Sequence, residues 1–227
     1  LLEESRLVAL QNLIVDSRYA NRAFRTNQNY VGQTLPNLQE RIHYVCPPPE
    51  LVKTLMAGLR TFLLRSEGIP APIRAAVVGF GFVYVHPFED GNGRLHRLLM
   101  HETLAGDGYT DPGVVLPLSA GMLREPHLYD RTLEGFSQTV LDRVQYDLNA
   151  RGGLTIKNPK EAAAVWRYPD FTAHAEYVLD LIERAVRHDL PAELDVLQRF
   201  DVGDLRGGGS AQSQTSAHAA PVAPKSW

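Results

Sequence analysis

The sequence lacks the features that mark several classes of protein. Its single cysteine, Cys46, cannot form an internal disulfide, so cysteine usage does not indicate an oxidising compartment. No apolar run reaches the roughly 18 residues that a membrane-spanning helix needs. The 23 Lys and Arg residues nearly balance the 26 Asp and Glu residues, giving a net charge of −3, without the strongly basic surface typical of nucleic-acid binding. We therefore expect a cytoplasmic protein with no membrane or nucleic-acid partner.

What is present is typical of a helical globular protein. The chain has 227 residues, 44% of them hydrophobic, enough for one large domain or two small ones. The spacing of apolar residues predicts helices around residues 7–14, 51–62, 73–85, 94–106, 129–144, 171–188 and 191–200. The segment 73–85 is apolar nearly all round, as a buried helix or strand would be, and its length favours a central helix. We expect Gly79 and Gly81 to let a neighbouring element approach it closely.

One short β element interrupts the helices. Glycine and prolines bracket the β-branched and aromatic stretch Arg41–Val45, which predicts a strand or hairpin arm. We divide the chain into an N-terminal helix expected to be truncated (1–26), a core (27–150), C-terminal helices packed on the core (151–202) and a low-complexity tail expected to be disordered (203–227). The basic stretch Arg18, Arg22 and Arg25 is expected to be a solvated face.

The segment 86–97, HPFEDGNGRLHR, is the part of the chain that indicates chemistry. It joins the predicted central helix to the start of the next one. Gly91 and Gly93 permit backbone conformations that direct successive N–H groups at an anion, at the positive end of a helix. Arg94 and Arg97 are three residues apart, so both guanidinium groups can hold phosphate oxygens on one side of the first turn.

Two further residues of the segment complete a reactive set. Asp90 is a hard carboxylate, suited to a Mg²⁺ ion that is shared with substrate phosphates. His86 precedes the loop and can accept a proton from an incoming hydroxyl. A phosphate site, a metal carboxylate and a base together predict phosphoryl or nucleotidyl transfer.

The segment closely resembles the Fic family, whose pattern is HxFx(D/E)GN(G/K)RxxR. The specified positions are met by His86, Phe88, Asp90, Gly91, Asn92, Gly93, Arg94 and Arg97. The resemblance covers roughly residues 27–149. It implies an all-α fold, a Fic-type helical bundle with a short β-hairpin flap next to the active-site loop. It also implies transfer of AMP from ATP to a Ser, Thr or Tyr hydroxyl of a target protein or of the chain itself.

The resemblance also implies roles for the motif residues. His86 would deprotonate the target hydroxyl, and Asp90 would bind Mg²⁺ that bridges the α- and β-phosphates of ATP. Phe88 would anchor the loop in the core.

Five motif positions would bind the nucleotide. By the same resemblance, Gly91, Asn92 and Gly93 would form an anion hole. Arg94 and Arg97 would hold the phosphates.

Outside the motif, the resemblance implies a flap and an adenine neighbour. In the family, a β-hairpin flap pairs with the backbone of the target by strand addition. Ile42, His43, Tyr44 and Val45 match that flap in position. Tyr129, at the start of a later helix, is a candidate to pack near the adenine.

An inhibitory helix expected from the family is missing. Many members carry (S/T)xxxE(G/N), whose Glu pairs with the second motif arginine, here Arg97. Glu precedes Gly at Glu67 and Glu134, but the residues four positions earlier are Leu63 and Asp130. The restraint therefore lies either before Leu1 or on another protein, and we favour the former because the chain opens inside a helix.

Two alternatives to AMP transfer stay open. One is another reaction on the same fold: AMP removal, phosphorylation, or transfer of another nucleotide or a phosphocholine-like group. Phosphorylating relatives tend to carry Lys at the position of Gly93, which favours nucleotidyl transfer here. The other is a nucleotide-sensing module without catalysis. The presence of His86 argues against this alternative, because binding phosphate alone needs no base.

Overall fold

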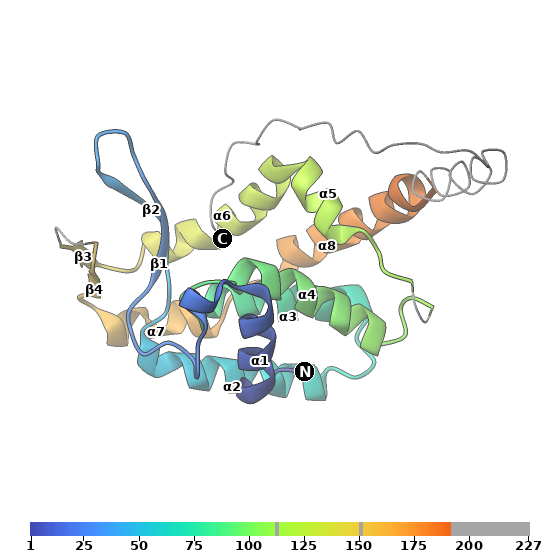
Figure 1. Ribbon diagram of the computed structural model, residues 1–227, viewed down its shortest axis with the longest axis horizontal. Helices are drawn as coiled ribbons and strands as arrows, with labels where there is room; N and C mark the ends of the chain where they lie inside the picture. Colours follow the sequence, from blue (N-terminus) through green and yellow to red (C-terminus); the bar gives the residue numbers. More distant parts are fainter. Residues whose placement is uncertain (112–113, 150–151, 192–227) are drawn as a thin grey trace, which may run out of the picture.

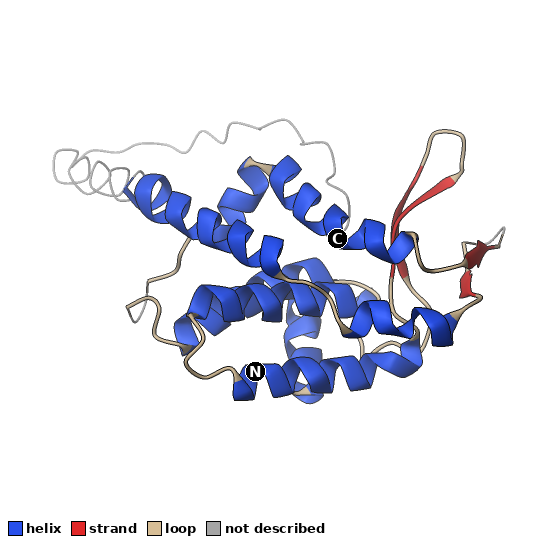
Figure 2. Cartoon of the chain, turned by 180° about the vertical axis from the view of Figure 1, so that it is seen from behind, coloured by secondary structure: helices blue, strands red, loops and turns tan. Residues whose placement is uncertain are grey.

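The structure, a computed structural model, describes residues 1–111, 114–149 and 152–191 (Figure 1). Helices make up most of this part, and the strands form two hairpins at one end of the molecule (Figure 2). The predicted helical class is therefore confirmed. No helix in the described ranges has the length and apolar character to cross a membrane.

The elements follow one another in a simple order. The first half contains α1 (Glu4–Ile14), the antiparallel hairpin β1 (Tyr30–Thr34) and β2 (Glu40–Val45), α2 (Pro49–Arg65), α3 (Ala71–Val85) and α4 (Asn92–Gly106). The second half contains α5 (Leu118–Arg124), α6 (Pro126–Leu141), the antiparallel hairpin β3 (Tyr146–Leu148) and β4 (Leu154–Ile156), α7 (Pro159–Arg167) and α8 (Thr172–Arg184), which continues into a π-helical turn (Ala185–Asp189).

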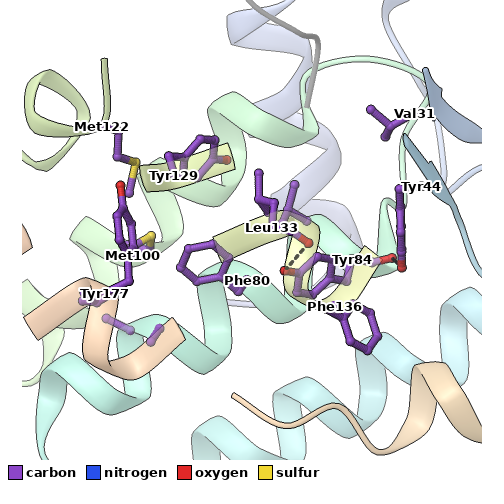
Figure 3. Close-up of a cluster of buried hydrophobic side chains, with 14 of the residues drawn as sticks. Val31, Tyr44, Phe80, Tyr84, Met100, Met122, Tyr129, Leu133, Phe136 and Tyr177 are labelled. Carbon is purple, nitrogen blue, oxygen red and sulfur yellow. Dashed lines mark hydrogen bonds between the residues drawn. The ribbon is translucent and has the colours of Figure 1, made fainter. Parts of the chain in front are cut away.

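Helix α3 lies at the centre of the molecule. Its sequence is apolar all round because it belongs to two clusters of buried side chains. One face packs with the β1–β2 hairpin, α6 and α8, and the other packs with α1, α2 and α4. In Figure 3, Phe80 and Tyr84 of α3 point toward Leu133 and Phe136 of α6, and the Tyr84 hydroxyl lies 3.5 Å from the Leu133 carbonyl. This central helix carries the motif loop at its carboxyl end.

The predicted close approach at α3 is confirmed. A Cβ atom on Gly79 would lie 2.3 Å from Cγ of Met100 on α4. A Cβ atom on Gly81 would lie 2.8 Å from Leu59 Cδ1 on α2. The absence of side chains at these two positions therefore sets the spacing of α2, α3 and α4.

Several boundaries and elements differ from expectation. Helix α4 begins at Asn92, two residues before the predicted start, because Gly91 adopts a left-handed conformation (φ 89°) at the position before it. The expectation of a single β element is wrong, since β3 and β4 form a second hairpin, and α5 and α7 were not predicted. The expected helix 191–200, beyond Pro191, and the expected disordered tail 203–227 lie outside the described residues.

Candidate active site

The motif loop is a tight connection between two buried helices. Helix α3 ends at His86, whose backbone is left-handed (φ 50°, ψ 59°), and α4 begins after Gly91. A side chain at Gly91 would meet Val15 Cγ1 at 2.8 Å, so the loop passes too close to the segment after α1 for any other residue. As expected, Phe88 is fully buried, and its ring packs against Phe24 with centroids 5.5 Å apart.

Asn92 holds the loop from inside. Its side-chain amide donates to the Phe88 carbonyl (2.9 Å), and its side-chain oxygen accepts from the Phe88 N–H (3.1 Å). The side chain therefore serves the conformation of the loop. The main-chain N–H groups of Asn92, Gly93 and Arg94 belong to the first turn of α4, where N–H groups have no acceptor within the helix. They are the donors available to an anion at this end.

His86 has the properties of a general base. Its Nδ1 donates to the Val83 carbonyl (3.0 Å), which assigns the proton to Nδ1 and leaves the Nε2 lone pair available. The side chain is only 6% exposed. The pKa of His86 is lowered to about 4, chiefly by burial. The Arg25 cation adds to this lowering, whereas the hydrogen bond to Val83 and the Asp90 carboxylate oppose it. His86 is thus neutral at physiological pH, as a proton acceptor must be.

Asp90 lies beside this base and is paired with Arg94. One carboxylate oxygen accepts from Arg94 (3.0 Å) and the other accepts from the Gly91 N–H (2.6 Å). Arg94 also donates to the Ile14 carbonyl at the end of α1. Both members of the Asp90–Arg94 ion pair have side chains that are 45% exposed, so a ligand can reach them.

The residues fit a Mg²⁺ ion that arrives with a nucleotide. In the described part of the chain, no three Asp, Glu, His or Cys side chains gather as a metal cage. Mg²⁺ in nucleotide sites usually takes one or two carboxylates and completes its shell with phosphates and water. Asp90, exposed beside the free N–H groups of α4, can supply such a carboxylate.

A groove of about 620 Å³ runs between the motif loop and the β1–β2 hairpin. It is lined by His86 and Glu89–Asn92 on the loop side and by Tyr30–Gly32, Thr34 and Glu40 on the hairpin side. The structure therefore places His86, Asp90, Gly91 and Asn92 together under the hairpin. Arg94, Arg97 and Tyr129 are not among the lining residues.

Arg97 and Tyr129 form a second group, whose members are not among the residues that line the groove. Arg97 is half-buried on α4, and its cation opposes the rise that burial causes in the pKa of Tyr129. The Tyr129 hydroxyl lies 3.0 Å from His96 Nε2, and the side chain is 8% exposed within the core. Tyr129, expected near the adenine, is thus a core residue that contacts Arg97.

The base of the hairpin is part of the core, whereas its tip is exposed. Tyr44 and Val45 are fully buried, and the Tyr44 hydroxyl donates to the Tyr84 carbonyl (2.7 Å). Their side chains are therefore out of reach of a docking protein. Of the four residues expected to form the flap, only Ile42 and His43 have side chains that a target could contact. Ile42 and His43 are half-buried, and Leu38 at the tip is 85% exposed.

Three residues that hold the motif loop were not recognised in the sequence. Arg25, expected on a solvated face, is 4% exposed and donates to the His86 carbonyl (2.7 Å). The fully buried Gln11 donates to the Asp90 carbonyl (3.2 Å), and Asn29 donates to the Phe88 carbonyl (3.5 Å). Because their partners are main-chain carbonyls, no side-chain pattern in the sequence could have indicated these contacts.

Comparison with known proteins relates the chain to one family. The model of the Fic/DOC family matches residues 1–104. A curated relative, "Protein adenylyltransferase Fic" from Drosophila erecta, is 39% identical over 97 residues, which cover 41% of this chain and 17% of the relative. The chain thus spans less than a fifth of that relative's length.

Two solved structures share the fold. A Fic family protein from Desulfovibrio desulfuricans G20 superposes with a TM-score of 0.53 at 22% identity, covering 85% of this chain and 48% of the other. A Fic domain containing signaling protein from Bacteroides thetaiotaomicron VPI-5482 gives a TM-score of 0.52 at 22% identity, covering 81% of this chain and 60% of the other.

Proposed function

Because the chain belongs to the Fic/DOC family, we propose that it is a protein adenylyltransferase. It moves AMP from Mg²⁺-bound ATP to a Ser, Thr or Tyr hydroxyl of a target protein. The observation that carries this proposal is His86, a neutral, buried histidine with Nε2 unprotonated, on the groove that also contains Asp90. A site that only bound phosphate would not need a base of this kind.

His86 starts the reaction in this proposal. Its Nε2 takes the proton of the target hydroxyl, whose oxygen attacks the α-phosphorus of ATP. The bond between the α-phosphorus and the bridging oxygen breaks, and pyrophosphate leaves. The Val83 carbonyl, already bonded to Nδ1, stabilises the imidazolium that forms.

The start of α4 binds the phosphates. The N–H groups of residues 92–94 and the helix dipole favour an anion at this point. Asp90 would hold Mg²⁺, which would neutralise phosphate charge. Arg94 and Arg97 hold phosphate oxygens.

The target docks along the β1–β2 hairpin. The strand β1 lines the groove opposite His86, and an extended target segment can add to a hairpin edge through main-chain hydrogen bonds. The half-buried Ile42 and His43 and the exposed tip are the parts of the hairpin accessible to such a segment.

Intact-protein mass spectrometry after incubation with ATP and Mg²⁺ tests the proposal. The wild type, offered a mixture of candidate acceptor proteins, should produce an AMP adduct that His86→Ala abolishes. His101→Ala is the matched control, because His101 is a half-buried histidine on α4 that does not line the groove. In a calorimetric titration, His86→Ala should retain ATP affinity and Arg97→Ala should lose about tenfold or more.

The other outcomes separate the alternatives. A phosphate adduct in the wild type would indicate a phosphotransferase on the same fold. Loss of AMP from a previously modified protein would indicate AMP removal. ATP binding with no adduct in any protein would favour a nucleotide-sensing module, and no ATP binding would refute the enzyme proposal.

A further inference from the structure

Arg25 is an arginine buried among carbonyl groups. Its side chain donates to four main-chain carbonyl oxygens: His86 (2.7 Å), Pro47 (2.7 Å), Asn27 (2.8 Å) and Val85 (3.3 Å). Only 4% of the residue is exposed. No carboxylate forms an ion pair with it in the part of the chain that the structure describes. A buried guanidinium that uses every nitrogen on backbone is unusual, because burying an unpaired cation is costly.

The contacts converge on the end of α3. The carbonyl groups of the last helical turn receive no hydrogen bond from within the helix, so they need donors from elsewhere. Arg25 supplies donors to Val85 and His86, and its own main-chain N–H donates to the Pro87 carbonyl (2.8 Å). Three consecutive carbonyls are thus fixed by one residue, at the point where His86 is held in its left-handed conformation.

The same guanidinium reaches the base of the hairpin. Asn27 precedes β1, and Pro47 follows β2. Arg25 therefore ties the two chain segments at the base of the hairpin to the backbone of His86, which lines the groove. Its position determines how far His86 lies from the hairpin.

We infer that Arg25 is a positioning residue for His86, which sets the orientation of the imidazole and its distance from the hairpin. The inference rests on the proposed function in that His86 is taken as the base. Arg25 contacts none of the side chains proposed to bind ATP. It should therefore affect turnover and not ATP binding. The charge of Arg25 supports this role. Burial is the main cause of the low pKa of His86, the Arg25 cation lowers that pKa as well, and Asp90 raises it.

Two variants separate the contacts of Arg25 from its charge. Arg25→Met loses both, whereas Arg25→Lys keeps the charge but cannot reach four carbonyls with one ammonium group. Arg74→Met is the matched control, because Arg74 also donates to a main-chain carbonyl, that of Leu63 (2.7 Å), and lies away from the motif. Each protein is labelled at histidine, and long-range proton–nitrogen NMR reports the tautomer and titration of His86, assigned with His86→Ala.

The two readouts have defined expected results. In Arg25→Met, His86 should lose its uniform Nδ1–H tautomer and titrate at higher pH than the wild-type value of about 4. In Arg25→Lys, the titration should stay low while kcat falls about tenfold or more with the KM for ATP unchanged. Arg74→Met should lower the melting temperature and leave both readouts of His86 as in the wild type.

Unchanged His86 spectra and unchanged kcat in folded Arg25→Met and Arg25→Lys would overturn the inference. If Arg25→Met does not fold, Arg25→Lys decides alone, because a purely structural role predicts wild-type kcat in the folded fraction. The proposed function fails separately, when the wild type transfers no AMP. In that case the NMR comparison still tests whether Arg25 positions His86.

Discussion

His86 shows how a helix end can produce a histidine that is neutral over the whole physiological pH range. The turn that ends α3 buries the ring, and the Val83 carbonyl fixes the proton on Nδ1. Both effects come from the backbone path of a few residues. The reactivity expected of the motif therefore depends on how the loop is held as well as on the motif sequence.

The pH dependence of turnover should reflect this environment. Because burial lowers the pKa of His86 to about 4, Nε2 stays unprotonated as the pH falls from 8 to about 6, and kcat should be flat in this range. Initial rates at saturating ATP and Mg²⁺ measure it, with circular dichroism at each pH to confirm folding. An acid limb centred near the ordinary histidine pKa of about 6.5 would contradict the assigned environment.

The motif residues were predictable from the sequence because they are contiguous, whereas the residues that hold the loop were not. Arg25 and Gln11 are far from the motif along the chain, and their partners are carbonyls, which every residue carries. Neither hydrophobic spacing nor charge pattern distinguishes a buried arginine from a solvated one in such a case. Burial of Tyr44 was likewise hidden, since strand alternation alone does not say which face meets the core.

At the scale of elements, α3 organises the molecule. A helix that is apolar on all sides must be covered on all sides, and two glycines let α2 and α4 approach it. The long helices were predictable because their apolar spacing repeats over several turns. Helix α5 and the strands β3 and β4 were not, because seven and three residues, respectively, are too short for a period to show.

The glycines of α2 and α3 offer a matched test of this packing. Gly79→Ala should destabilise the fold by about 1–3 kcal/mol, because its Cβ would overlap Met100 at 2.3 Å. Gly58→Ala, in the exposed middle of α2 with nothing within 4 Å of the added carbon, should stabilise by up to about 1 kcal/mol. Urea denaturation measures both. Equal effects of the two substitutions would show that α3 and α4 are not in close contact.

At the scale of the whole molecule, the core contains several neutral histidines. Burial lowers the pKa of His86 to about 4, of His96 to about 3 and of His174 to about 4. His96 contacts the Tyr129 hydroxyl, and His174 contacts the Tyr84 hydroxyl (2.7 Å). These rings lie in or next to the cluster around α3. The exclusion of water from this core therefore lowers the pKa of all three.

Acid should therefore destabilise the fold well above the range in which carboxylates titrate. The unfolded chain takes up a proton on each histidine near pH 6.5, whereas the folded chain does so only near the lowered values. Stability is thus complete above about pH 6.5 and falls by up to about 1.4 kcal/mol per pH unit for each of the three groups below it. Urea midpoints at pH 7.5, 6.5 and 5.5 measure the slope.

A variant shows whether the histidines are responsible. His174→Gln removes one of the groups with a lowered pKa, so the slope below pH 6.5 should become shallower. A urea midpoint that does not change between pH 7.5 and 5.5 in the wild type would mean that these rings are charged or solvated in the folded state.

The contacts of Arg25 also bear on the order in which the molecule assembles. Arg25 lies 61 positions before His86 in the chain and 22 before Pro47, so its carbonyl partners come together only when distant segments meet. Until then its cation is better left in water. The base of the hairpin and the motif loop should consequently order in one cooperative step and open in one, with matching hydrogen-exchange protection. The site is then either assembled as a whole or absent, with no half-built form in which the base faces an unanchored hairpin.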